Sequence, residues 1–377
     1  MKVLHVISSG GMYGAEAVIL NLVHAMREAG HESVLGIFSN SAQPNLQFYE
    51  RAVSEGLEAH LIACEGQADR TVPQAIRALA KKTGADVVHA HGYKADIYVY
   101  LAMCALPTPI VSTCHNWIDS DLRVRVYGVL DRWVLRRYAA VVTVSEPVGE
   151  RLLRAGVRPE RICFLRNGID LRPFEAAHAR ASESSTNGPL AVGFVGRLSH
   201  EKGADLFVRA AGRILKHLPQ TRFLLVGDGP EQEAIKSLVR ELHLGDRVAL
   251  LGRCDDMPAF YASLDLLVLS SRTEGLPMTL LEGMASSLAI VATAVGAVPS
   301  VVESERTGLL IAPEDEDALA AAMSSLLADR PRRVAFGAAG HAVVAERYSA
   351  ARMADEYLRV YKQVLDQAKT QNVNAAA

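Results

Sequence analysis

Short apolar runs alternate with amphipathic stretches along most of this chain, and no other feature restricts its fold as much. In the first half, apolar runs of strand length occur at residues 3–7, 33–38, 57–62, 87–90, 110–113 and 140–144. The alternation starts again in the second half, with runs at residues 190–195, 222–226, 248–251, 264–269, 290–293 and 308–311. Strands that alternate with helices predict parallel sheets covered by helices. We therefore predict an α/β chain with a doubly wound parallel sheet in each half, whose ligands lie beyond the carboxyl ends of the strands.

A stretch of different composition separates the two halves. Residues 174–189 show no apolar periodicity and are rich in Ser, Ala and Gly, which is typical of an interdomain linker. The alternative is a long surface loop. The predicted boundaries are 1–173 for the N-terminal domain and 190–351 for the C-terminal domain. A chain of 377 residues is long enough for two such cores.

Composition and charge argue against several classes of protein. The formal net charge is −2, so no overall field favours nucleic acid as a partner. The five cysteines are scattered and form no CxxC pair, which indicates reduced thiols rather than a disulfide framework or a zinc site. The apolar run at the N-terminus is too short for a signal peptide, and no apolar run has the length that spans a bilayer. We expect a cytoplasmic protein.

The stretch SRTEGLPMTLLEGMAS, residues 271–286, follows an apolar run and carries two glutamates. Pro277 is tolerated in a first helical turn and good helix formers follow it, so Glu274 is expected in the loop and Glu282 on the helix. The N–H groups and the dipole of a helix N-terminus favour a phosphate, whereas carboxylates accept hydrogen bonds from sugar and ribose hydroxyls. These groups together indicate a nucleotide-sugar site, and two solvated helix glutamates are the alternative.

Two further loops have phosphate-binding character. In VGRLSHEKG, Arg197 and Lys202 follow the first strand of the second half. Arg binds phosphate as a fork and Lys as a point charge. Cations at a helix start oppose the helix dipole, which weakens their interpretation as plain surface charges. In SSGGMYG, Gly10 and Gly11 let the backbone approach a ligand closely; the loop lacks the GxGxxG dinucleotide pattern, and an ordinary tight turn is its alternative.

Three histidines lie at the ends of predicted strands. His115 follows the carboxyl end of the run 110–113, which favours a functional role. His89 and His91 share one face of a strand because the side-chain period is two; a metal pair is one interpretation, and a satisfied structural histidine is favoured for His89. The pair Asp255-Asp256, which precedes Met-Pro, is interpreted as a helix cap rather than as a carboxylate metal motif. We therefore predict no bound metal.

A basic stretch lies between residues 117 and 138, where arginines are interleaved with Trp, Val and Leu. One interpretation is a patch that touches an anionic membrane surface. The other is a packed helix with a solvated basic side. Peripheral contact of the N-terminal domain with the inner face of the membrane therefore stays open, and so does the oligomeric state.

Several of these motifs occur together and in order. VGRLSHEKG, LLVGDGP and SRTEGLPMTLLEGMAS in the second half, with the glycine pair, IVSTCHN and RNGID in the first, resemble the retaining glycosyltransferases of family four. Those enzymes have the GT-B fold of two facing Rossmann-like domains with a cleft between them. The resemblance covers nearly the whole chain and implies that the last helix, about residues 352–369, returns to the N-terminal domain. One departure is Gly283, where family members often have Ala, and Gly lowers helix stability.

The resemblance also implies roles for individual residues. Arg197 and Lys202 would clamp the donor diphosphate, Glu274 would hold the donor sugar, and Glu282 would take the ribose diol. His115 would approach the reaction centre, and would be catalytic together with Arg197, Lys202 and Glu274. The full donor-binding set would be Gly10, Gly11, Gly196, Arg197, Lys202, Gly227, Gly229, Arg253, Glu274, Gly275, Leu276, Pro277 and Glu282. The acceptor side would consist of Gly11, Tyr13, His91, His115 and Asn116.

The predicted function is a retaining transfer of a hexose from a UDP- or GDP-sugar to a glycan, a lipid-linked or a small-molecule acceptor, as in cell-envelope or exopolysaccharide synthesis. Arg197, Lys202 and a helix N-terminus would stabilise the departing diphosphate, so a divalent ion is unnecessary and no cofactor is expected. A sugar-nucleotide epimerase of the same fold and a nucleotide-sugar-binding protein without turnover are the alternatives. The sequence names neither the donor base and sugar nor the acceptor and its linkage.

Overall fold

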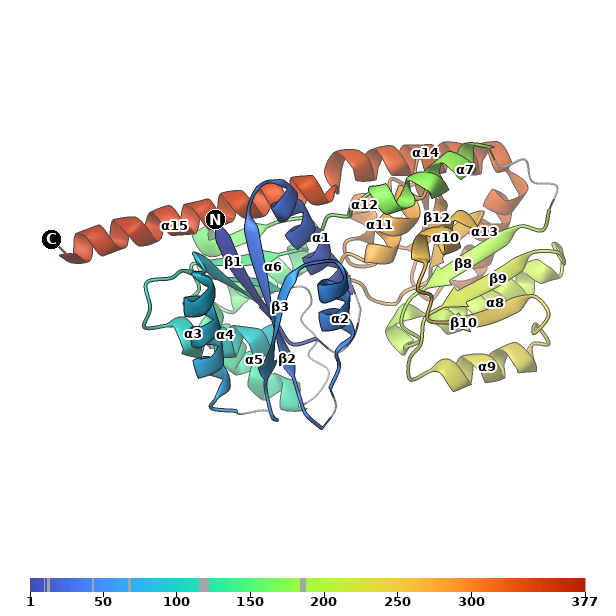
Figure 1. Ribbon diagram of the computed structural model, residues 1–377. Helices are drawn as coiled ribbons and strands as arrows, with labels where there is room; N and C mark the ends of the chain where they lie inside the picture. Colours follow the sequence, from blue (N-terminus) through green and yellow to red (C-terminus); the bar gives the residue numbers. More distant parts are fainter. Residues whose placement is uncertain are drawn as a thin grey trace. The chain divides into compact units, whose positions relative to one another are not determined.

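The structure is a computed structural model that describes residues 1–9, 11, 14–42, 44–66, 69–114, 122–183 and 188–376, except for the side chains of residues 122–127, 180–183 and 371–376. It comprises two compact units, one formed by Met1–Gly168 with Ala350–Ala377 and the other by Ile169–Ser349. Each unit contains a parallel sheet with helices packed on it (Figure 1). The predicted α/β class with two parallel-sheet domains is confirmed.

Unit 1 contains a seven-stranded sheet in the order β3-β2-β1-β4-β5-β6-β7. Its strands are β1 Lys2–Ile7, β2 Glu32–Ser39, β3 Glu58–Ala63, β4 Val87–His91, β5 Ile110–Cys114, β6 Ala140–Thr143 and β7 Ile162–Phe164. Its helices are α1 Gly14–Glu28, α2 Gln47–Ser54, α3 Val72–Thr83, α4 Tyr93–Met103, α5 Leu122–Leu135, α6 Glu146–Arg154, the 3-10 turn η1 Pro159–Arg161, and α15 Ala350–Ala376. Residues of β4 and β5 are buried along the whole strand because a parallel sheet with crossover helices is covered on both faces.

Unit 2 contains a six-stranded sheet in the order β10-β9-β8-β11-β12-β13. Its strands are β8 Ala191–Val195, β9 Arg222–Val226, β10 Val248–Gly252, β11 Leu266–Leu269, β12 Ala289–Thr293 and β13 Gly308–Ile311. Its helices are η2 Arg172–Phe174, α7 Glu175–Glu183, η3 His200–Lys202, α8 Ala204–Leu215, α9 Gln232–Glu241, α10 Met257–Ala262, α11 Met278–Ala285, α12 Val298–Val301, α13 Glu316–Ala328 and α14 Arg330–Arg347. All neighbouring strands in both sheets pair in parallel.

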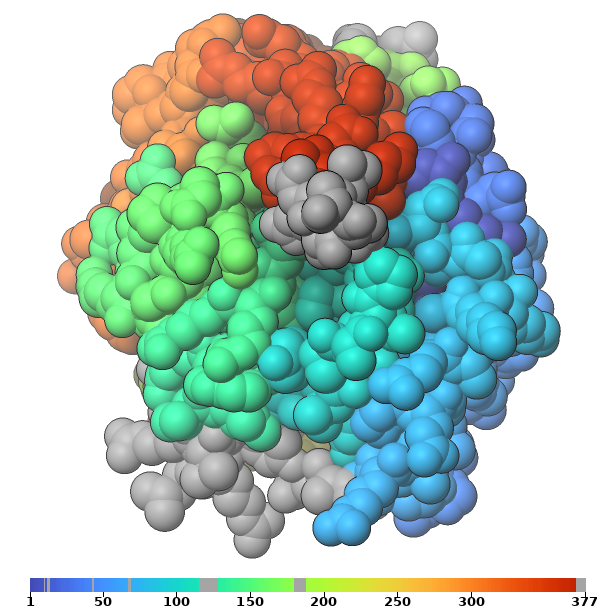
Figure 2. All heavy atoms as spheres, turned by 90° about the vertical axis from the view of Figure 1, so that its left-hand side faces the viewer, coloured from blue at the N-terminus to red at the C-terminus, as the bar shows by residue number. Residues whose placement is uncertain are grey.

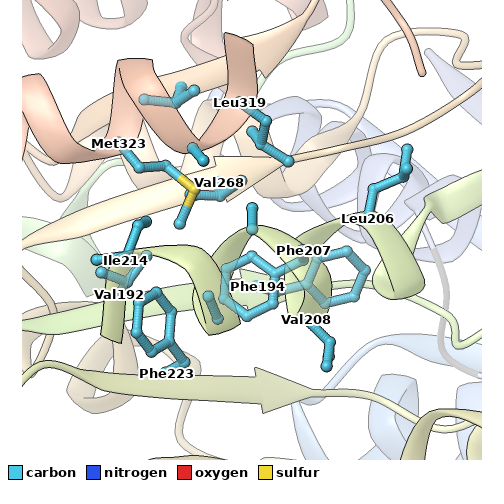
Figure 3. Close-up of a cluster of buried hydrophobic side chains, with 14 of the residues drawn as sticks. Val192, Phe194, Leu206, Phe207, Val208, Ile214, Phe223, Val268, Leu319 and Met323 are labelled. Carbon is cyan, nitrogen blue, oxygen red and sulfur yellow. The ribbon is translucent and has the colours of Figure 1, made fainter. Parts of the chain in front are cut away.

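Aromatic side chains form the centre of the unit 2 core (Figure 3). Phe194 on β8 and Phe223 on β9 lie on the same side of the sheet, and both pack against Phe207 of α8. The ring of Phe207 lies 5.6 Å from that of Phe194 and 5.8 Å from that of Phe223. Rings at such distances stabilise a core beyond the apolar area that they bury. This packing holds α8 against the strands whose loops carry the predicted donor motifs.

The strand order creates a point in unit 2 where the chain changes direction. β8 lies between β9, which follows it in the chain, and β11, which comes later. Loops that leave the carboxyl ends of two such neighbouring strands diverge and leave room for a ligand. The loops after β8 and β11 are the two that carry Arg197, Lys202 and Glu274, so the fold brings these motifs together.

The prediction of an irregular linker at residues 174–189 is wrong for its first half. Residues Glu175–Glu183 form helix α7, which packs against α10 and α14. Phe174 and Ala177 are buried, and the ring of His178 stacks on that of His341 at 3.9 Å. Alanine is the strongest helix former, and of the described side chains of α7 Ala177 is buried and His178 is partly buried. A helix whose contact face consists of small residues and a histidine shows no apolar periodicity, which explains the incorrect prediction.

The last helix, α15, packs on unit 1 although it follows unit 2 in the chain. Its Tyr361 and Tyr357 are buried, and their hydroxyls lie 2.7 Å from His89 Nδ1 and 3.0 Å from Thr113 Oγ1, respectively. Buried hydroxyls and imidazoles are stable only when they are hydrogen-bonded, so these contacts fix α15 on the sheet of unit 1. Neither α15 nor another described helix is long and apolar enough to cross a membrane.

Unit 1 also buries a pair of carboxyl groups. Asp96 on α4 is 1% exposed and Asp131 on α5 is 2% exposed. Burial raises the pKa of Asp131 to about 7, although the hydrogen bond from Asp96 and the charge of Arg132 oppose this rise. Burial, and then the nearby charge of Asp131, raise the pKa of Asp96 well above its ordinary value. Two carboxyl groups this close cannot both ionise easily, so the pair retains a proton near neutral pH.

Candidate functional site

The loop after β8 positions the first two predicted phosphate-binding cations. Arg197 is exposed, and Lys202 ends the short 3-10 turn η3 and is partly buried. Gly203 then adopts φ +66°, and a Cβ at this position would lie only 2.1 Å from the carbonyl oxygen of Ser270. The Ser270 hydroxyl donates back to the Gly203 carbonyl at 2.7 Å. Glycine is therefore required here, and the contact joins this loop to the end of β11.

Lys202 and Glu274 form an ion pair within unit 2. The Lys202 Nζ lies 2.6 Å from Glu274 Oε1, and the Ser271 hydroxyl donates to the same oxygen at 2.7 Å. The Glu274 side chain is only 7% exposed and that of Lys202 is 29% exposed. Glu274 lies in the loop before α11, as predicted from the sequence. The structure thus places next to each other two side chains that were expected to hold adjacent parts of a donor, the diphosphate and the sugar.

Arg272 connects the two loops of this site, and the sequence analysis did not predict this role. Its guanidinium donates two hydrogen bonds of 2.8 Å to the carboxylate of Asp205 and one of 2.8 Å to the carbonyl of His200. It also pairs with Glu314, and its own backbone N–H donates to the carbonyl of Glu201 at 2.7 Å. Arg272 therefore holds the loop after β11 against the loop after β8, which fixes the positions of Lys202 and Glu274.

Glycines and backbone contacts also support Glu274 from the side of β12. Gly296 has φ +56°, and a Cβ there would lie 2.0 Å from the Glu274 carbonyl oxygen. The N–H of Ala297 donates to the carbonyl of Gly275 at 2.9 Å. Leu276 is buried, and Pro277 in extended conformation precedes the first residue of α11. Among the described residues no side chain caps this helix, so its first N–H groups remain suited to an anion.

Glu282 lies on α11, as predicted, and has a partner that the sequence did not reveal. Tyr261 of α10 is fully buried, and its hydroxyl donates to Glu282 Oε2 at 2.6 Å. Burial raises the pKa of Glu282, whereas the hydrogen bond from Tyr261 opposes this rise. Tyr261 therefore orients the carboxylate and favours its charged form. The role of Glu282 toward a ribose stays a prediction.

Gly283, the departure from the family pattern, has a local packing reason. A Cβ at this position would lie 2.2 Å from Leu267 Cδ2, and Leu267 on β11 is fully buried. Alanine would displace a core side chain, and such overpacking destabilises proteins. The glycine thus lets α11 approach β11 closely while Glu282 keeps its place one residue earlier.

The loop after β9 is joined to the loop after β8. A Cβ on Gly227 would lie 1.9 Å from the carbonyl oxygen of Gly196, and one on Gly229 would lie 2.3 Å from that of Leu198. Arg253 pairs with Asp228 at 2.6 Å, with both side chains well exposed. These glycines therefore allow close backbone packing of the two loops. Whether Gly196, Gly227, Gly229 and Arg253 also contact a donor stays a prediction.

The predicted residues of unit 1 are only partly described. Gly10, Tyr13, His115 and Asn116 lie outside the described residues. Gly11 is described, and its carbonyl accepts a hydrogen bond of 2.8 Å from the Ser9 hydroxyl. The acceptor-side assignment of these residues, and the assignment of His115 as catalytic, therefore stay predictions.

His91 belongs to a buried histidine cluster with His89 and His5. Among the described residues, these three histidines are of a type that can bind a metal ion, and their ligand atoms lie within 4.8 Å of one another. Both ring nitrogens of His89 are hydrogen-bonded, to Tyr361 and Thr113, so the prediction of a structural histidine is confirmed. His91 Nε2 lies 3.1 Å from His5 Nδ1, and burial lowers the pKa of His5 to about 3. The nitrogens of this cluster are thus engaged in part with one another and in part with Tyr361 and Thr113.

The interpretation of Asp256 as a helix cap is confirmed. Its Oδ1 accepts a hydrogen bond of 3.0 Å from the N–H of Ala259, in the first turn of α10. A capping aspartate satisfies one of the free N–H groups at a helix start. This cap helps to hold α10, which carries Tyr261.

Comparisons with known proteins extend over both units. Residues 12–172 match the family described as Glycosyltransferase Family 4, and residues 176–343 match that described as Glycosyl transferases group 1. The chain is 32% identical over 245 residues to the lipopolysaccharide core biosynthesis mannosyltransferase LpsB of Rhizobium meliloti, a match that covers 62% of this chain and 68% of that protein. It is 26% identical over 368 residues to the N-acetyl-alpha-D-glucosaminyl L-malate synthase of Bacillus anthracis, with coverage of 93% and 94%.

A solved structure resembles the whole chain as well. The crystal structure of Anabaena Alr3699/HepE in complex with UDP has a TM-score of 0.81, with 20% sequence identity, and the match covers 96% of this chain and 100% of that one. At this level of identity the likeness is one of fold.

Proposed function

This chain is a member of the group 1 glycosyltransferases of family 4 and has the GT-B fold, and we propose that it transfers a hexose with retention of configuration from a UDP- or GDP-sugar. As a glycosyltransferase it uses a nucleotide sugar as donor and a sugar-containing or related acceptor. The proposed acceptor is a glycan, a lipid-linked or a small-molecule hydroxyl compound in cell-envelope or exopolysaccharide synthesis. The lipopolysaccharide mannosyltransferase among the relatives supports this range.

The observation that carries the proposal is the Lys202–Glu274 pair beside the N-terminus of α11. A nucleotide sugar has a dianionic diphosphate next to a ring with several hydroxyls. Lys202 and the free N–H groups of α11 suit the first, and the Glu274 carboxylate suits the second. Their 2.6 Å contact brings the two side chains to one point of the site, so one ligand with a phosphate next to hydroxyls can reach both. When a donor binds, its phosphate would take over Lys202 and its hydroxyls would donate to Glu274.

The proposed mechanism follows from the charges that develop on the sugar and on the diphosphate during the reaction. As the bond between sugar and diphosphate breaks, positive charge grows on the sugar and negative charge on the leaving group. Arg197, Lys202 and the α11 N-terminus stabilise the leaving group, and the Glu274 carboxylate stabilises the cationic sugar. Fixed protein cations replace a divalent ion in this scheme, so we propose that the enzyme requires no metal.

Retention is proposed to occur on the front face of the sugar. A double displacement needs a carboxylate that is free to attack the anomeric carbon. With donor bound, Glu274 would accept hydrogen bonds from Ser271 and from the sugar hydroxyls, and Glu282 is held by Tyr261, so neither is poised as a nucleophile. The departing phosphate instead helps to remove the proton of the acceptor hydroxyl. The enzyme would act in the cytoplasm, where nucleotide sugars are its substrates.

A donor panel with product analysis tests this function. The protein is incubated with UDP- and GDP-sugars, with and without glycan and lipid-linked acceptors, and the products are identified by mass spectrometry. We expect nucleoside diphosphate to appear faster when both donor and acceptor are present. Conversion of the donor to an isomeric nucleotide sugar without acceptor would identify an epimerase instead. Thermal stabilisation by a donor with no conversion at all would identify a binding protein, and either result would refute the proposal.

A further inference from the structure

Large apolar side chains are exposed on one part of unit 1. On α5, Val129 is 61% exposed, Leu130 44% and Trp133 43%, and on α6 and β7, Leu153 is 48% and Phe164 43% exposed. Val129 and Trp133 are four residues apart and so lie on the same face of α5. Single exposed apolar residues are normal on a protein surface, but several on neighbouring elements mark an interaction surface. We call the exposed side of α5, α6, η1 and β7 the arginine face, because these elements and their connections are rich in arginine.

These elements form one continuous surface. Arg136, just after α5, donates from Nε to the carbonyl of Ala155 at 2.6 Å, and Arg161 donates to the carbonyl of Arg136 at 2.9 Å. The end of α5 therefore lies against the end of α6 and against η1. Figure 2 shows the corresponding teal and green stretches side by side on one face of the molecule. The elements that carry these five exposed apolar residues thus adjoin one another.

The chain segment that carries most of these apolar side chains is rich in arginine. Between residues 128 and 166 the chain has eight arginines and four acidic residues. Of the acids, Asp131 is buried, and Glu150 is paired with Arg154. The whole chain has a formal net charge of −2, so the basic character is local to this face.

Two arginines lie directly on the exposed aromatic rings. The guanidinium carbon of Arg137 lies 3.6 Å from the ring centre of Trp133, and that of Arg166 lies 5.4 Å from the ring centre of Phe164. The ring of Tyr100 also packs edge-on against Trp133 at 5.5 Å. Trp133 is therefore held in an exposed position, with a cation at its side, by contacts from two helices. This combination of an apolar ring and an adjacent cation suits the boundary between water and lipid.

We infer that the arginine face docks on the surface of an anionic lipid bilayer. Apolar side chains would enter the headgroup region while the arginines contact lipid phosphates, the two attractions that hold interfacial helices on membranes. A second copy of the chain is disfavoured as the occupant, because two such faces would bring like charges together. Nucleic acid would attract the arginines but would leave the aliphatic side chains without a partner. The inference concerns only unit 1 and does not depend on the donor site.

Vesicle binding of the full-length protein tests the inference. Vesicles of phosphatidylcholine alone are compared with equimolar phosphatidylcholine and phosphatidylglycerol, by co-sedimentation. We expect binding to the anionic vesicles only, weakened when NaCl is raised from about 0.1 M to about 0.5 M. In a Trp117→Phe background, Trp133 is the remaining tryptophan, and its emission should shift to the blue on binding. Equal binding to neutral vesicles, or no binding to either kind, would overturn the inference.

A pair of matched variants locates the surface. The double variant Val129→Ser and Trp133→Ser should bind anionic vesicles about tenfold or more weakly, because it removes the apolar anchors. The control is Leu251→Ser with Val334→Ser, which changes two residues of unit 2 with exposures of 49% and 42%, and it should bind as wild type. Donor turnover in solution reports folding for both. If both variants bind equally, or if the first instead abolishes self-association of the protein, the lipid assignment is wrong.

Discussion

Replacing Arg272 by Ala should disconnect the two loops that form the proposed donor site. The Arg272 side chain is only 12% exposed and Asp205 is 31% exposed, so their double hydrogen bond is largely shielded from water. Breaking a buried ion pair costs about 3–5 kcal/mol. Because Asp205 keeps partial access to water and Glu314 is 57% exposed, we take the lower end, about 3 kcal/mol for unit 2. Burial pushes the pKa of Asp205 upward, and it is Arg272 that holds this pKa below its ordinary value.

Hydrogen exchange measured by mass spectrometry can assign this loss to unit 2. A change of 3 kcal/mol corresponds to about 100-fold faster exchange of the most protected amides, which we expect in β11 and α8. The matched control is Arg213→Ala, because Arg213 also bridges two acids, Glu316 and Asp317, but is 50% exposed. Exposed pairs contribute about 0–1 kcal/mol, so the control should exchange less than about fivefold faster.

Turnover provides the second part of this test. Because Arg272 fixes the positions of Lys202 and Glu274 relative to each other, its removal should lower kcat by about tenfold or more. Small misplacements of catalytic groups have effects of this size. Arg213→Ala should leave kcat unchanged. The reasoning is refuted if the two variants lose equal stability, or if Arg272→Ala keeps both wild-type exchange and wild-type turnover.

Four further predictions follow from the same geometry. Glu274→Gln should mainly lower kcat, and Glu282→Gln should mainly raise the donor KM, because only the sugar changes charge in the transition state; steady-state kinetics in which both change KM alone would contradict this arrangement. Tyr261→Phe should raise the pKa of Glu282 further, because the variant loses the hydrogen bond that opposes the effect of burial. When the pH is lowered, the donor KM of this variant should therefore start to increase at a higher pH than the donor KM of wild type. Asp131 has a folded pKa raised from 3.8 to about 7, so wild-type stability should fall as pH rises from about 4 through about 7, and Asp131→Asn should flatten this dependence in thermal unfolding. EDTA should leave turnover intact, and loss of activity that Mn²⁺ or Mg²⁺ restores would contradict the metal-free scheme.

The alternation of apolar and amphipathic segments was sufficient to predict both sheets. The runs that form the central strands β4, β5, β6, β11 and β12 are buried along their whole length, whereas those of β3 and β10 at the sheet edges are partly exposed. The apolar composition of the central runs therefore distinguishes them from their neighbours. The position of Glu274 before α11 and the cap at Asp256 were also predictable, because proline placement and aspartate caps are local signals. In contrast, helix α7 was missed, since the contacts of its described side chains come from Ala177 and His178 rather than from large apolar residues.

Arg272 and Tyr261 were missed for a different reason. The partner of Arg272, Asp205, lies 67 positions earlier in the chain, and the partner of Tyr261, Glu282, lies 21 positions later. Neither residue belongs to a local pattern that indicates its partner. The folded strand order, which places β11 beside β8, brings Arg272 to Asp205. Tyr261 and Glu282 meet because α10 and α11, which precede and follow β11, fold close together there. Loop motifs therefore predicted the candidate donor-binding residues Lys202 and Glu274, but they did not predict Arg272 and Tyr261, which orient the candidate residues.

The claim that the donor diphosphate binds between the β8 loop and the N-terminus of α11 can be tested by one titration. Isothermal titration calorimetry with UDP and GDP compares wild type with the double variant Arg197→Met and Lys202→Met. Two charge-assisted contacts at about 1.5 kcal/mol each predict a Kd about 100-fold weaker for the nucleotide that wild type binds. The control, Arg209→Met with Lys216→Met, removes two exposed cations from α8 and its C-terminal cap, and it should bind as wild type. Equal affinity of the double variant and wild type for both nucleotides would contradict the account.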